Sequence, residues 1–182
     1  MNRFIVMSVL VIWVSGCVHQ ELAPNSAFAA LCGNTYKGAV VSTDPQDEDW
    51  RKEVLTLGPI KCIGADNIAM PLAVGSNTSR TWLITGQGEN LELRHQHLHA
   101  DGSPDAVSLY GGKIAEPAKL IGASWRMDFP ADQQTIDIFN ANDLQVSNTN
   151  VWTLEVSPDL LVYELNRENR NFRAEFDLTQ AR

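Results

Sequence analysis

Apolar and polar residues alternate along most of this chain. In the stretches 121–129, 151–156 and 172–178, apolar side chains occupy every second position and mostly polar ones lie between them, and Trp82 and Ile84 lie among threonines. Because successive side chains of a β-strand point to opposite faces, a period of two predicts strands with one buried face. Further strands are expected at 35–43, 52–62, 67–74, 90–99, 106–111 and 160–167.

Turn-forming residues separate these segments, for example at 86–88, 101–104 and 111–112. Only the stretch 131–141 has good helical spacing, and Asp132 could cap its first turn. About eight to ten short antiparallel strands predict an all-β fold, either a sandwich or an up-and-down barrel. We favour a lipocalin-like or calycin-like barrel, because closing a meander removes its exposed edges.

A barrel of this size is either packed solid or holds one small ligand. Three tryptophans, Trp82, Trp125 and Trp152, fall on apolar faces and are expected to fill or line the interior. They serve as core in the first case and as ligand contacts in the second, and the alternation does not distinguish the two.

The first residues, MNRFIVMSVLVIWVSGC, have the form of a bacterial export signal. Arg3 precedes an apolar run, 4–14, that is shorter than the roughly 20 helical residues needed to cross a bilayer. Residues 14–17 resemble the lipobox of bacterial lipoproteins. The resemblance implies cleavage after residue 16 and acylation of Cys17, with palmitate as a label. An ordinary cleaved signal with an incidental cysteine is the alternative.

The chain is therefore expected to have three parts: a signal peptide at 1–16, a lipidated N-terminus and tether at 17–30, and a β-barrel domain at 31–182. Val18 follows the cysteine at the position where an aspartate would signal inner-membrane retention in enteric bacteria. We accordingly expect an outer-membrane lipoprotein that faces the periplasm.

Charge limits the partners. The formal net charge is −8 and no basic patch is present. This balance argues against nucleic acid as a partner and against adsorption to anionic lipid head groups. The membrane is then a partner only through the lipid anchor, and protein partners stay open.

Cys32 and Cys62 remain once Cys17 is assigned to the anchor. The exported compartment is oxidising, so two such cysteines are expected to form a disulfide. Metal binding by two thiols so far apart in the chain is the weaker alternative.

The stretch LELRHQHLHADG, 91–102, places His95, His97 and His99 at every second position. On a strand they share one face with Leu91 and Leu93. We expect them to point inward, toward one mouth of the barrel near the turn that follows.

Three interpretations of this row are open. In the first, two of the histidines bind zinc or copper with a carboxylate such as Asp101 or Asp105, because three imidazoles spread over about 13 Å of strand cannot grip one ion. In the second, they form the polar end of a ligand cavity. In the third, they bond to turn backbone or to those carboxylates and pin a hairpin. The candidate ligand contacts are His95, His97, Trp82, Trp125 and Tyr110, and the candidate metal ligands are His95, His97, His99 and Asp101.

Two other charged groups are expected to be solvated. The acidic run at 44–49 lacks the ligand spacing and the glycine of a calcium loop. Arg167, Arg170 and Arg173 are expected on the polar face of the last hairpin. No catalytic residue is assigned, because the stretch 122–126 lacks the second glycine of a nucleophile elbow.

From Arg80 onward the chain resembles a family of secreted proteobacterial proteins. The resemblance is carried by RTWLIT, 80–85, by the long stretch 91–112, and by FPAD, SNTNVWTLEV and FRAEFDL at 129–132, 147–156 and 172–178. It implies an exported protein with a lipocalin-like or calycin-like shape, and it supplies no activity, cofactor or catalytic residue that can be carried over to this chain. The leading hypothesis is a binder of a small apolar or amphipathic molecule. A metal-binding protein and an interaction module of an envelope complex are the alternatives.

Overall fold

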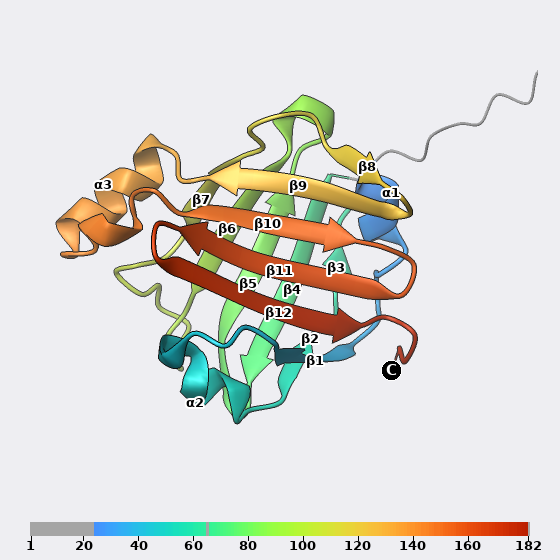
Figure 1. Cartoon of the computed structure of the whole chain (residues 1–182), viewed down its shortest axis with the longest axis horizontal. Coiled ribbons are helices and arrows are strands. Elements are labelled where there is room, and N and C mark those ends of the chain that lie inside the picture. The colour runs from blue at the N-terminus through green and yellow to red at the C-terminus, as the bar shows by residue number, and fades with distance from the viewer. Residues whose placement is uncertain (1–23, 65, 182) are drawn as a thin grey trace, which may run out of the picture.

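The computed structural model describes residues 24–64 and 66–181, and in this part of the chain the fold is all-β, as predicted (Figure 1). It contains twelve strands: β1 (Tyr36–Val40), β2 (Leu55–Leu57), β3 (Lys61–Cys62), β4 (Asn67–Val74), β5 (Asn77–Thr85), β6 (Glu92–His97), β7 (Tyr110–Lys113), β8 (Lys119–Ile121), β9 (Ser124–Pro130), β10 (Val151–Val156), β11 (Leu160–Arg167) and β12 (Arg170–Asp177). The α-helices are α1 (Pro24–Ala29), α2 (Glu48–Arg51) and α3 (Gln133–Ala141), and the 3-10 helices are η1 (Pro45–Asp47), η2 (Gly88–Asn90) and η3 (Gln145–Ser147).

The strands form one curled antiparallel sheet in the order β7-β6-β5-β4-β2-β1-β12-β11-β10-β9-β8, with β3 beside β4. Every pairing within it is antiparallel. One end of the path, β7, approaches β9, the strand next to the other end: Asp132 N donates to Gly111 O at 3.1 Å and Ala115 N donates to Asp128 O at 2.9 Å. These bonds join the end of β9 to β7, so the meander curls back on itself.

Glycine turns divide two of the expected strands. Gly58, with φ of +121°, lies directly after β2. The expected strand 52–62 is therefore divided into a connection that follows α2, strand β2 and strand β3. Gly122, with φ of +63°, makes a hairpin between β8 and β9 inside the expected strand 121–129. A positive φ is readily adopted by glycine alone, which is why the turns fall there.

Helix α3 confirms the helix expected at 131–141. The Asp132 carboxylate caps it by accepting from Thr135 N at 3.0 Å. The hydroxyl of Thr135, which is fully buried, accepts from Gly111 N at 2.7 Å and donates to Gly111 O at 2.6 Å. A residue with a side chain could not replace Gly112 here, because its Cβ would lie 1.9 Å from Pro130 O. Helix α3 is thereby fixed against β7.

Helix α1 lies within the segment expected to be a tether. Phe28 is fully buried and Leu31 is nearly so, and both belong to the main hydrophobic core. In Figure 1, α1 lies at the end of the sheet opposite α2 and α3. The folded domain therefore includes residues before 31. The predicted signal 1–16 and Cys17 lie outside the described residues.

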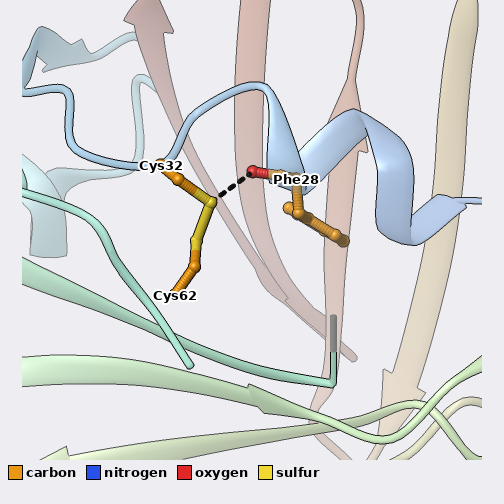
Figure 2. The surroundings of a disulfide bond; sticks show 3 residues. All are labelled: Phe28, Cys32 and Cys62. Atoms are coloured by element: carbon orange, nitrogen blue, oxygen red, sulfur yellow. Dashed lines mark hydrogen bonds between the residues drawn. A yellow bond between two sulfur atoms is a disulfide. The ribbon is translucent and has the colours of Figure 1, made fainter. Parts of the chain in front are cut away.

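A disulfide joins Cys32, just after α1, to Cys62 of β3 (Figure 2). The two Cα atoms are 5.8 Å apart, within the usual range for such a bond. Sγ of Cys32 also lies 3.8 Å from Phe28 O. The sequence-based prediction of this disulfide is confirmed.

Most of the core lies on the concave face of the sheet. The inward positions of β10, β11 and β12 carry Trp152, Tyr163 and Phe176, all buried. Within residues 24–64 and 66–181, no helix combines the length and apolarity required to cross a bilayer.

Candidate ligand-binding cavity

A cavity of about 410 Å³ lies at the end of the barrel that carries α2 and α3. This volume falls within the range of typical small-molecule pockets, roughly 300 to 1,000 Å³. Its floor is buried and mostly apolar or aromatic, and includes Leu55, Leu72, Trp82, Tyr163, Ala174 and Phe176. Its rim is half-exposed and includes Trp50, Arg80, His97, Leu144, Arg167 and Arg170. The cavity therefore opens to solvent between the two helices.

His95 lies in the wall of this cavity and is only 3% exposed. Its Nδ1 is 3.2 Å from the carbonyl oxygen of Tyr110, and its Nε2 is 2.9 Å from the hydroxyl of Tyr163. A carbonyl can only accept, so Nδ1 carries the hydrogen and Nε2 accepts from Tyr163. Burial lowers the pKa of His95 to about 3, so the imidazole is neutral at neutral pH.

Aromatic rings form the surface that faces the cavity. Trp82 stacks on Tyr163 with ring centroids 4.3 Å apart and meets Phe176 edge-on at 5.9 Å. The imidazole of His95 stacks on Tyr110 at 4.7 Å. Such contacts fix the rings in place, because offset and edge-on pairs stabilise beyond the area they bury.

His97 lies one step nearer the rim. Its Nε2 is 3.2 Å from the hydroxyl of Tyr110, and burial together with the charge of Arg80 lowers its pKa. The hydroxyl of Ser108 accepts from His97 N at 2.9 Å and donates to His97 O at 3.1 Å. The Ser108 side chain therefore replaces the backbone hydrogen bonds of the β6–β7 ladder at a position that precedes β7. His95, His97, Tyr110 and Trp82 are thus brought together at one cavity, as the ligand interpretation predicts.

The proposed metal ligands are not brought together. Strand β6 ends at His97, and His99 N instead donates to Ser103 O across a turn. The imidazole of His99 is largely exposed and lies 3.9 Å from a carboxylate oxygen of Asp105, while Asp101 accepts from Ser103. In the described chain, no group of three or more His, Cys, Asp or Glu side chains could hold a metal ion. The histidines separate because the strand ends before the row does.

Trp125 also lies elsewhere. It lines a second pocket, of about 520 Å³, at the α1 end, together with residues such as Leu31 and Pro158. It shares the inward face of β9 with Phe129 but comes at the other end of the strand. Trp125 therefore points inward, as predicted, but it lies at the other end of the barrel from the proposed ligand contacts.

Comparisons with known protein families, with curated proteins and with solved structures find no match. The resemblance to a secreted proteobacterial family therefore stays a prediction, and the cavity must be interpreted from its own residues.

Two arginines expected on the outer face of the last hairpin line the cavity instead. Arg167 and Arg170 occupy the same register as the inward residues Tyr163 and Phe172, as Arg80 does with Trp82. Arg173 does face outward, where it pairs with Glu164 and Glu175. The alternation of apolar and polar residues already indicated this inward placement, because Arg80, Arg167 and Arg170 each lie on the same strand face as apolar residues.

The acidic run 44–49 is not wholly solvated either. Asp47 is 2% exposed, accepts from the Ser42 hydroxyl at 2.7 Å and pairs with Arg170. Asp44 pairs with the same guanidinium at 3.2 Å. These contacts bind the loop of η1 and α2 to the β11–β12 hairpin at the cavity rim.

Proposed function

We propose that the protein binds one small apolar or amphipathic molecule in this cavity. The observation that carries the proposal is a pocket of about 410 Å³ whose buried floor is aromatic and aliphatic and whose polar groups gather at the rim. A closely packed interior would leave no such volume. The burial of apolar ligand surface against this floor supplies the affinity, and the rim groups orient the polar end.

We further propose that this binder lies in the cell envelope. Our proposal includes acylation of Cys17 and an outer-membrane location facing the periplasm, which rest on the export signal and lipobox alone. The alternative of an interaction module has weaker support. The large exposed apolar side chains lie on separate elements, with Leu120 and Ile121 of β8 as neighbours.

Dye binding tests the proposal. The full chain carrying Cys17→Ser, purified without detergent, is titrated with the neutral apolar dye N-phenyl-1-naphthylamine, whose fluorescence rises in apolar surroundings. Ala174 lines the cavity, and Ala174→Phe should fill it and weaken dye binding at least about tenfold. Ala39→Phe is the matched control, because Ala39 is exposed on β1.

Circular dichroism and thermal unfolding confirm that both variants are folded. Equal dye affinity in the Ala174→Phe and Ala39→Phe variants would place the dye outside the cavity and reject the proposal. Absence of dye binding to the parent chain would reject it as well.

A further inference from the structure

Three strands place an arginine on the inward register at the cavity rim. They are Arg80 of β5, Arg167 of β11 and Arg170 of β12, and all three line the cavity. Inward positions of a barrel are normally apolar, because taking a charge out of water is costly unless it is paired. The partners of each guanidinium group therefore indicate what the rim is built to hold.

Arg170 is neutralised within the protein. It pairs with Asp44 at 3.2 Å and also with the buried Asp47, in a two-oxygen contact. The guanidinium carbon of Arg170 also lies over the ring of Phe172, 5.7 Å from the ring centroid. Both carboxylates at this rim are thus used by one arginine.

Arg80 and Arg167 are held by uncharged groups. The guanidinium carbon of Arg80 lies 5.0 Å from the centre of the Trp50 ring, and Arg167 donates to the amide oxygen of Asn150 at 3.1 Å. Across the described residues, neither guanidinium has a carboxylate oxygen within 4.0 Å. Stacking, a hydrogen bond of 3.4 Å from Arg80 to the Ser79 hydroxyl and a single amide contact position these groups and leave most of their N–H donors available.

The rim is therefore locally positive on an acidic protein. Of the three guanidinium groups there, Arg170 is paired with Asp44 and Asp47, while the whole chain has a formal net charge of −8. The nearby Asp105 carboxylate acts on His97 and Tyr110 but lies beyond ion-pair distance of Arg80 and Arg167. Burial and then the charge of Arg80 lower the pKa of His97, and Arg80 also opposes the burial that raises the pKa of Tyr110 to about 12, while the Asp105 carboxylate raises the pKa of both groups. Arg80 acts on these two groups because all three border the same space.

We infer that the ligand is an amphipathic anion, whose carboxylate binds Arg80 and Arg167 at the rim and whose apolar body fills the cavity. This inference rests on the proposed function and adds the charge of the ligand to it. The planar guanidinium fork matches a carboxylate in shape and donates two parallel hydrogen bonds to it, which a neutral head group cannot exploit equally.

A matched pair of ligands tests the inference. Decanoate and decanol share an alkyl chain length and differ in head-group charge, and each is used to displace N-phenyl-1-naphthylamine from the Cys17→Ser chain. Decanoate should bind at least about tenfold more tightly than decanol. This comparison needs no further variant, so it does not depend on how any substitution folds.

Variants then assign the preference to the rim. Arg80→Gln with Arg167→Gln should lower the affinity for decanoate about tenfold or more and leave that for decanol within about twofold. Arg173→Gln is the control, because Arg173 carries the same charge on the outer face, where it pairs with Glu164 and Glu175.

The outcomes separate the two proposals. Equal binding of decanoate and decanol by the parent chain would overturn the inference and leave the proposed function standing. A preference for decanoate that persists in the double variant would also overturn it, since the charge would be recognised elsewhere. If dye, decanoate and decanol all fail to bind, the proposed function and the inference fail together.

Discussion

His95 is a base that the fold keeps uncharged. Its pKa falls from 6.5 to about 3, first because burial disfavours the imidazolium and then because His97 and Arg94 add positive charge nearby. Between these two values the unfolded chain takes up a proton and the folded chain does not. The free energy of unfolding should therefore fall as the pH falls through this window, by up to about 1.4 kcal/mol per pH unit from this residue.

Urea unfolding at several pH values measures this dependence in the parent chain and in His95→Gln. Glutamine keeps a donor and an acceptor but does not titrate, so its stability should change less steeply below pH 6.5. The carboxylates contribute equally to both proteins, which leaves the difference to His95. Parallel curves for the two proteins would mean that His95 is not held neutral.

The hydroxyl of Tyr163 supplies the hydrogen bond to His95 Nε2 at 2.9 Å. Tyr163→Phe keeps the ring that stacks on Trp82 but leaves a buried acceptor without its donor. We expect a loss of about 1–3 kcal/mol in the free energy of unfolding, measured by urea titration. An unchanged midpoint would show that water or another donor replaces the hydroxyl.

At the level of single residues, period-two alternation predicted which side chains point inward, and it placed His95 and His97 correctly at one mouth. It did not show that β6 ends at His97, because a strand's end depends on a turn formed by Asp101 and Ser103. The prediction for Arg167 and Arg170 was wrong because their charge favoured an exposed position on the polar face of the last hairpin. Their register, shared with inward aromatics, was the better guide.

The disulfide acts at the scale of elements, because it joins the segment after α1 to β3. Its ends are 30 residues apart in the chain, so reduction should lower the free energy of unfolding by about 3–4 kcal/mol in the chain-entropy account. Urea unfolding with and without a reductant measures the change. Coincident curves, with thiols shown to be free, would contradict the expectation.

Phe28 is a fully buried side chain of helix α1. Phe28→Ala should cost about 3–5 kcal/mol of unfolding free energy. Ala30→Ser, at an exposed position beside the helix, is the control and should change stability little. Equal unfolding midpoints for the two variants would mean that α1 is not part of the cooperative fold.

Among the elements, long alternating strands and the capped helix α3 were predictable, because their patterns repeat over several residues. Helix α1 was not, since six residues make too few turns to show a helical period. The turns at Gly58 and Gly122 depend on positive φ angles, which the pattern of apolar and polar residues does not indicate. The curl of the sheet agrees with the expected meander, but β7 and β8 remain its edge strands, so the predicted removal of edges is not complete.

The whole molecule is expected to be anchored through Cys17. Cys17→Ser should move the protein from the membrane fraction to the soluble fraction and abolish palmitate labelling. Fractionation and metabolic labelling of cells expressing each form measure this. Unchanged membrane association of the variant would contradict acylation at this position.

The position of α1 determines which end of the domain an acylated Cys17 would keep near the membrane. Six residues, 18–23, separate Cys17 from Pro24, and an extended chain of this length reaches about 24 Å at most. An acylated Cys17 would therefore hold the α1 end near the bilayer and turn the opening between α2 and α3 toward the aqueous side. A ligand would then be exchanged with a soluble donor or acceptor, and not by lateral entry from the lipid.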